Sequence, residues 1–179
     1  MQVPADDHPE HRARRHWTQC LEAVAGAGLE LPAAALEPHA LAVLEASEFV
    51  ALACTRHPAL LHRLVTTGDL ARTYTAGAMR ERLQAALTEG ADEPALQAAL
   101  RRFRREQMVR IVWRDLARLA TLAETLEDLT ELADACIEAA LERLHAWTIA
   151  QYGVPRDAEG REQRLVVIGM GKLGARELN

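Results

Sequence analysis

The chain has 179 residues, of which 49% are apolar and only 4% aromatic, and its formal net charge is −5. This length can bury a sizeable core in one or two domains, and the abundance of Leu and Ala favours a mainly α protein. The acidic balance argues against a general nucleic-acid-binding protein, which needs a basic surplus. No stretch is long and apolar enough to predict a membrane-spanning helix.

The cysteines and the N-terminus predict the compartment. Cys20, Cys54 and Cys136 are odd in number, far apart and in no metal-ligand spacing, which is typical of reduced thiols. The N-terminus lacks the basic-then-apolar order of a signal peptide. We therefore expect a cytoplasmic chain that binds neither nucleic acid nor membrane.

The first part of the chain predicts a disordered N-terminus over 1–9 and a helical region over 10–153. Helices are expected at 10–25, at 38–55, and from Pro58 to near Gly68, with a linker around Pro32. The expected core residues of the 38–55 helix are Leu41, Leu44, Phe49 and Leu52.

Further helices are expected at 76–88, at 93–120 and onward to Tyr152. Asp92 is a good N-cap for the second of these, and capping-box patterns after residue 120 predict a break before the third. Trp113 and Trp147 are interpreted as core anchors. The last helix shows apolar residues at steps of three and four, which predict a packing seam of Leu126, Leu129, Ala133, Cys136, Ala140, Leu144 and Trp147.

After a linker at 154–163, the pattern changes over 164–179. The β-branched run Leu165–Ile168 predicts a strand, followed by a glycine-rich turn with Gly169, Gly171, Lys172 and Gly174. Backbone amides in such a turn can approach a phosphate, and Lys172 could neutralise its charge. The same glycines match a dinucleotide-binding fingerprint, and they are equally consistent with a turn that needs glycine only for close packing.

A row of basic residues on the 93–120 helix is a second candidate site. Arg110, Arg114 and Arg118 recur every four residues and so share one helix face. This face could receive phosphate or an acidic partner. We favour a structural interpretation, either a solvated face with pairs such as Glu106 to Arg110, or a match to an acidic stripe on the next helix at Asp134, Glu138 and Glu142.

Several segments, in order, carry a family resemblance. The run GMGKLGARELN, Gly169–Asn179, resembles the start of the nucleotidyltransferase motif of the bifunctional glutamine synthetase adenylyltransferase/adenylyl-removing enzymes. The segments Ser47–Leu64 and Arg101–Leu141 resemble helical parts of the same family. The similarity covers most of the chain from about Ser47 onward.

The resemblance implies an activity and partners. The family has two nucleotidyltransferase-like domains, of which the N-terminal one removes AMP from a tyrosine of glutamine synthetase by phosphorolysis and the C-terminal one adds AMP from ATP. PII-type signalling proteins control the balance, which regulates nitrogen assimilation. A motif that follows about 160 residues of helix fits the N-terminal, adenylyl-removing half, whose fold resembles that of polymerase-β-like nucleotidyltransferases.

The resemblance also implies a nucleotide site. Leu173, Gly174 and Ala175 would hold the phosphates, although Ala175 departs from the more usual Gly or Ser. The family's Ser-x-Asp-x-Asp segment, which binds two Mg²⁺ ions beside an ATP- or AMP-type nucleotide, is absent from these 179 residues. We therefore expect no catalytic or metal-binding residue here, no bound cofactor and no catalysis by the chain alone.

The expected fold is mainly α: a helical bundle followed by the truncated start of a polymerase-β-like nucleotidyltransferase domain, with one strand, a glycine turn and a short helix. On this interpretation the chain is an N-terminal fragment of the family enzyme. The alternatives are a free-standing helical protein-interaction module and a truncated dinucleotide-binding protein.

Overall fold

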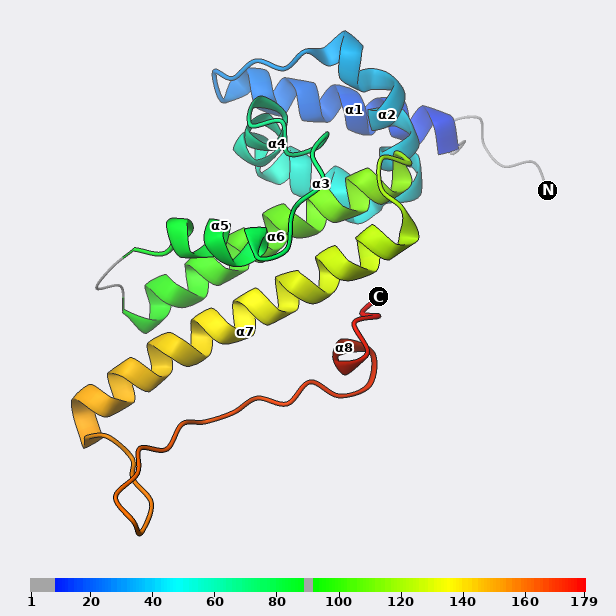
Figure 1. Cartoon of the computed structure of the whole chain (residues 1–179). Helices are drawn as coiled ribbons and strands as arrows, with labels where there is room; N and C mark the ends of the chain where they lie inside the picture. Colours follow the sequence, from blue (N-terminus) through cyan, green and yellow to red (C-terminus); the bar gives the residue numbers. More distant parts are fainter. Residues whose placement is uncertain (1–8, 89–91) are drawn as a thin grey trace, which may run out of the picture. The chain divides into compact units, whose positions relative to one another are not determined.

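A computed structural model of the chain describes residues 9–88 and 92–179, which are mainly helical (Figure 1). The expected disorder of residues 1–9 falls outside the described residues, except for Pro9, which begins the first helix. The helices are α1 (Pro9–Gly26), α2 (Ala33–Ala46), α3 (Glu48–Arg56), α4 (Pro58–Thr66), α5 (Ala78–Ala86), α6 (Glu93–Leu116), α7 (Leu122–Tyr152) and α8 (Gly171–Gly174). None of the described helices is long and apolar enough to cross a membrane.

The chain divides into two units. Unit 1 takes Met1–Thr73 and Arg105–Thr125, and unit 2 takes Tyr74–Arg104 and Leu126–Asn179, so that α6 and α7 each contribute to both. In unit 1, helices α1 to α4 gather around a common core (Figure 1). Trp17, Leu44, Leu61 and Trp113 are among its buried side chains, which confirms Trp113 as a core anchor. Removal of this apolar surface from water stabilises the unit.

The helix expected at 38–55 is two helices, because Ser47 ends α2 and begins α3. The backbone of Ser47 is extended, and its hydroxyl accepts a hydrogen bond from the amide of Val50 at 3.3 Å. A serine with this geometry is an N-cap, which satisfies an otherwise free amide of the following helix. Apolar residues continue at helical spacing through this position, and this pattern led to the prediction of a single helix.

The break at Ser47 changes which apolar residues are buried. Leu44 on α2 is fully buried, as predicted, whereas Phe49 and Leu52 on α3 are 46% and 40% exposed. Val50, Ala51, Ala53 and Cys54 are the residues of α3 that enter the core instead. The prediction of Phe49 and Leu52 as core residues was therefore wrong, because the new helix starts with a different rotation about its axis.

The beginning of α6 follows the sequence prediction, and its end comes earlier than predicted. The carboxylate of Asp92 accepts a hydrogen bond from the amide of Ala95 at 2.9 Å, which confirms the N-cap. At the other end Arg118 has a positive φ of 58°, and the amide of Leu119 donates to the carbonyl of Arg114 at 2.7 Å. This is a Schellman-type C-cap in which arginine takes the position that glycine usually occupies.

The buried face of α7 has the predicted period and a different phase. Its buried apolar residues are Leu132, Ala135 and Ala139, each one position before a member of the predicted seam. Leu144, a predicted seam residue, is 46% exposed. Because Leu and Ala are mixed along this helix, several of its faces are apolar enough to be buried. The side chains that pack against the helix determine which face is buried.

The segment after α7 is extended and largely exposed (Figure 1). A tight reversal at 156–163 joins Arg156 and Glu162 in an isolated antiparallel bridge, as expected for a hairpin turn. The predicted strand Leu165–Ile168 is not confirmed, because these residues pair with no strand in the described part of the chain and their side chains are 51–78% exposed. A β-strand requires a partner for its backbone amides and carbonyls.

Candidate functional site: the glycine-rich turn and the arginine row

The glycine-rich turn is a single compact turn of chain. The helix α8 ends in the same way as α6: Arg176 has a φ of 57°, and its amide donates to the carbonyl of Leu173 at 3.1 Å. The amide of Glu177 donates to the carbonyl of Lys172 at 2.8 Å. The structure thus brings together all the residues predicted to bind nucleotide, Gly169, Gly171, Lys172, Gly174 and Ala175.

Two of the glycines are required by the turn itself. A Cβ atom on Gly174 would lie 2.5 Å from the carbonyl oxygen of Gly169, a distance that no side chain tolerates. Gly171 has a φ of +59°, a conformation that glycine adopts without strain. The structural interpretation of these glycines, close packing of a turn, therefore has direct geometric support.

Three of the donors predicted to hold phosphate are engaged within the chain. The amide of Ala175 donates to the carbonyl of Gly171 at 2.9 Å, and the amide of Gly174 lies 3.5 Å from the carbonyl of Met170. The ammonium group of Lys172 donates to the side-chain carbonyl of Asn179. The described residues also contain no group of three or more His, Cys, Asp or Glu side chains placed to hold a metal ion. These three contacts would have to open before the same donors could reach a phosphate.

Arg176, which sequence reasoning did not single out, attaches the turn to α7. Its guanidinium donates to both carboxylate oxygens of Glu127, one at 3.1 Å, and to the carboxylate of Asp134 at 3.4 Å. The hydrogen bond from Arg176 lowers the pKa of Glu127. The sequence does contain a signal for this contact. Arg176 is a basic residue two positions after the last glycine, and α7 carries a stripe of acidic residues.

The acidic stripe of α7 is matched within unit 2. Asp134 pairs with Arg176, Glu138 pairs with Arg80, and Glu142 accepts a hydrogen bond from the side chain of Gln84 at 3.3 Å. The predicted match of this stripe to the arginine row is therefore wrong. Arg80 and Gln84 lie on α5, and Arg176 follows α8.

The arginine row is not one exposed face. Arg110 and Arg114 are 0% and 1% exposed, whereas Arg118 is exposed at the C-cap of α6. The predicted pair of Glu106 with Arg110 is replaced by a bidentate hydrogen bond from Arg63 to Glu106. The spacing of four correctly placed Arg110 and Arg114 on one face, but this face lies against the loop after α4 and is closed to a partner.

Arg110 and Arg114 stabilise this loop through its carbonyl groups. Arg110 donates to the carbonyls of Asp69 at 3.1 Å and Arg72 at 2.6 Å. Arg114 donates to the carbonyl of Leu70 at 2.9 Å and to the carboxylate of Glu124 at 2.6 Å. Buried carbonyls need donors, and the guanidinium supplies several in a fixed geometry. The row is therefore part of the structure of unit 1.

The cysteines show no sign of nucleophilic activation. All three thiols are free, with Cys20 and Cys54 fully buried and Cys136 half-buried. Burial raises the pKa of each of them, which disfavours the reactive thiolate.

Comparison with known proteins places the chain in a family. The family described as Glutamate-ammonia ligase adenylyltransferase matches residues 38–179, a range that includes both candidate sites. This match leaves the dinucleotide-binding alternative without support.

Curated relatives agree with the family match. A bifunctional glutamine synthetase adenylyltransferase/adenylyl-removing enzyme of Thioalkalivibrio sulfidiphilus is 50% identical over 143 residues, which are 79% of this chain and 15% of the relative. Relatives with the same name from Pseudomonas aeruginosa and Pseudomonas syringae pv. tomato are 47% and 40% identical over 87% and 94% of this chain. The chain spans less than one fifth of the length of each. It belongs to the glutamate-ammonia ligase adenylyltransferase family.

Proposed function

We propose that this chain is the N-terminal part of the adenylyl-removing half of an enzyme that adenylylates and deadenylylates glutamine synthetase. The observation that carries the proposal is the family match over 38–179, which runs without interruption from α2 through the glycine-rich turn. In this proposal the whole protein removes AMP from a tyrosine of glutamine synthetase by phosphorolysis and adds AMP from ATP. It is regulated by a PII-type protein and is located in the cytoplasm.

The 179 residues alone are proposed to be inactive. Nucleotidyl transfer depends on electrostatic stabilisation of the transition state, and loss of one preorganised donor costs about 10²–10³ in rate. The sequence has no Ser-x-Asp-x-Asp segment, and three donors of the glycine-rich turn, the amides of Gly174 and Ala175 and the ammonium group of Lys172, are engaged within the chain. Mg²⁺ and the nucleotide are therefore proposed to be held mainly by other residues of the whole protein.

The role of unit 1 in this proposal is that of a rigid support. The buried arginines Arg110 and Arg114 fix the loop after α4, so these two side chains are closed to a protein partner. This finding removes the arginine row as the basis for a separate interaction module.

A chimera tests the proposed function. The segment of the Pseudomonas aeruginosa relative that aligns with this chain over 171 residues can be replaced by the corresponding residues of this chain. We expect the chimera to remove the adenylyl group from adenylylated glutamine synthetase when phosphate and Mg²⁺ are added, with phosphate as the acceptor and ADP as the product. A chimera that folds and deadenylylates glutamine synthetase but no longer adenylylates it would contradict the assignment to the adenylyl-removing half.

The same assay on the 179-residue chain tests its proposed inactivity. Turnover above that of a buffer blank would contradict this part of the proposal.

A further inference from the structure

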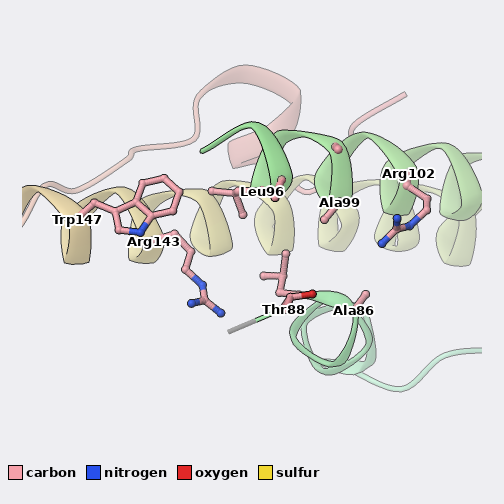
Figure 2. A pocket seen from close by; sticks show the side chains of 10 residues that line it. Ala86, Thr88, Leu96, Ala99, Arg102, Arg143 and Trp147 are labelled. Carbon is pink, nitrogen blue, oxygen red and sulfur yellow. The ribbon is translucent and has the colours of Figure 1, made fainter. Parts of the chain in front are cut away.

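Unit 2 contains a cavity that the family assignment does not explain. It has a volume of about 240 Å³ and lies between the end of α5, the first half of α6 and the last third of α7 (Figure 2). Leu87, Leu96 and Ala99 form much of its apolar lining, and Trp147 closes one side. This volume corresponds to about eight water molecules in the liquid, enough for one small organic molecule.

Trp147 gives the cavity a flat wall. Sequence reasoning interpreted this residue as a core anchor, but its side chain is only half-buried, and Figure 2 shows the indole beside Leu96. Leu96 itself is 4% exposed. An indole face that is accessible next to a buried leucine offers a stacking surface for a planar ring.

Two arginines reach the same cavity from different helices. Arg102 extends from α6 and Arg143 from α7, and in the view of Figure 2 Arg143 lies toward the Trp147 end of the lining and Arg102 at the other end, beyond Ala99. Neither makes an ion pair or hydrogen bond with another described residue. Arg80 and Arg114, in contrast, pair with Glu138 and Glu124.

Two guanidinium groups without carboxylate partners at one apolar cavity favour an anion. Arg102 is exposed and Arg143 half-buried, and no described carboxylate pairs with either of them, so an anionic group in the cavity would be stabilised by both charges. Guanidinium groups bind carboxylate and phosphate through paired, charge-assisted hydrogen bonds. Hence the apolar lining favours the apolar part of a ligand, and the two arginines, which we call the cationic rim, favour its anionic group.

We propose that this cavity binds a small aromatic anion, with its ring against Trp147 and its carboxylate or phosphate group between Arg102 and Arg143. The proposal concerns the 179-residue chain itself and does not depend on any activity toward glutamine synthetase. A small-molecule site in the helical part would allow a metabolite to act on this region without entering the nucleotide site.

Binding is tested with phenyl phosphate and benzoate as probes and benzyl alcohol as the neutral control. The readout is the NMR signal of the Trp147 indole N–H, assigned by its loss in Trp147→Phe. We expect a saturable shift with at least one of the two anions below about 10 mM, and a shift at least tenfold weaker in affinity with benzyl alcohol. The stronger of the two anions identifies the acid group. The signals of Trp17 and Trp113, buried in unit 1, are expected to stay in place.

Charge-removing variants identify the cationic rim. Arg102→Gln and Arg143→Gln are each expected to weaken binding of the preferred anion at least tenfold. Arg101→Gln, which changes the exposed neighbour on α6, is the matched control and is expected to change affinity less than twofold. Arg143→Lys keeps the charge and is expected to retain more affinity than Arg143→Gln. Circular dichroism verifies that each variant keeps its helix content.

The proposal is overturned by any of three results: no saturable shift with either anion, equal binding of benzyl alcohol, or affinity unchanged in both glutamine variants.

Discussion

Arg114 in unit 1 and Arg176 in unit 2 make similar contacts in different surroundings. Each donates to a carboxylate of α7, Arg114 to Glu124 and Arg176 to Glu127. Arg114 is buried and also satisfies two backbone carbonyls, whereas the side chain of Arg176 is 48% exposed. Water can replace the contacts of Arg176 and cannot replace those of Arg114. The same residue type is thus a permanent part of one region and a reversible attachment in the other.

The largest effect is expected from Arg114→Ala. It leaves the carboxylate of Glu124 and the carbonyls of Leu70 and Leu119 without their buried donor. Breaking a buried pair of this kind costs about 3–5 kcal/mol of unfolding free energy. Urea denaturation followed by circular dichroism measures the loss. Arg15→Gln, on the exposed side of α1, is the control and is expected to stay within about 0.5 kcal/mol of the parent chain. A similar loss in both variants would show that the buried contacts of Arg114 are not the cause of its effect.

Gly174→Ala is expected to open the glycine-rich turn and leave the helices folded. The new Cβ would meet the carbonyl oxygen of Gly169 at 2.5 Å, so the backbone must move. We expect hydrogen exchange of the Ala175 and Glu177 amides to accelerate at least tenfold, equivalent to about 1.4 kcal/mol. Gly169→Ala is the milder comparison, because its Cβ meets the movable side chain of Leu173 at 3.2 Å. Unchanged exchange in Gly174→Ala would show that the turn is not held as described.

Arg118→Gly is expected to stabilise unit 1. Arg118 holds a φ of 58° at the C-cap of α6, which costs a residue with a Cβ about 1 kcal/mol more than glycine. Part of this gain is offset because glycine is more flexible in the unfolded chain. An increase of about 0.5 kcal/mol in the free energy of unfolding is therefore expected from urea denaturation. A decrease would show that the exposed arginine side chain makes a stabilising contact.

The smallest effect is expected from acidification of the Arg176 contact. The pKa of Glu127 is lowered by its hydrogen bond from Arg176, so the contact contributes above the ordinary carboxylate pKa and is lost as the pH falls through the lowered value. The NMR signal of the Arg176 Nε–H is expected to move at acidic pH. Glu127→Gln is expected to abolish this movement and to change global stability by less than about 1 kcal/mol. A signal that still moves in the variant would assign the titration to another group.

Sequence reasoning succeeded where the signal is local. The N-cap at Asp92 and the helices around it follow from side chains that bond to amides three residues away. Trp113 was predicted to lie in the core for its size and apolarity, and it is 1% exposed. The resemblance carried by Gly169–Asn179 and the segments before it led to the family that the comparisons show.

Sequence reasoning failed where residues far away in the sequence determine which face of an element is buried or paired. Arg110 and Arg114 share a face, as their spacing requires, but only the folded loop at 69–73 determines that this face is buried. The phase of the buried face of α7 likewise depends on what packs against Leu132 and Ala139. The extended segment at 165–168 has the composition of a strand and no partner to form one.

The distribution of the thiols has a practical consequence for experiments on this chain. A maleimide label under native conditions should attach to the half-buried Cys136 alone, which marks α7 in unit 2. Cys20 and Cys54 are 0% exposed, so they become available only when the helices around them separate. The rate at which maleimide modifies Cys20 and Cys54 therefore reports the transient opening of unit 1, and the measurement needs no engineered cysteine.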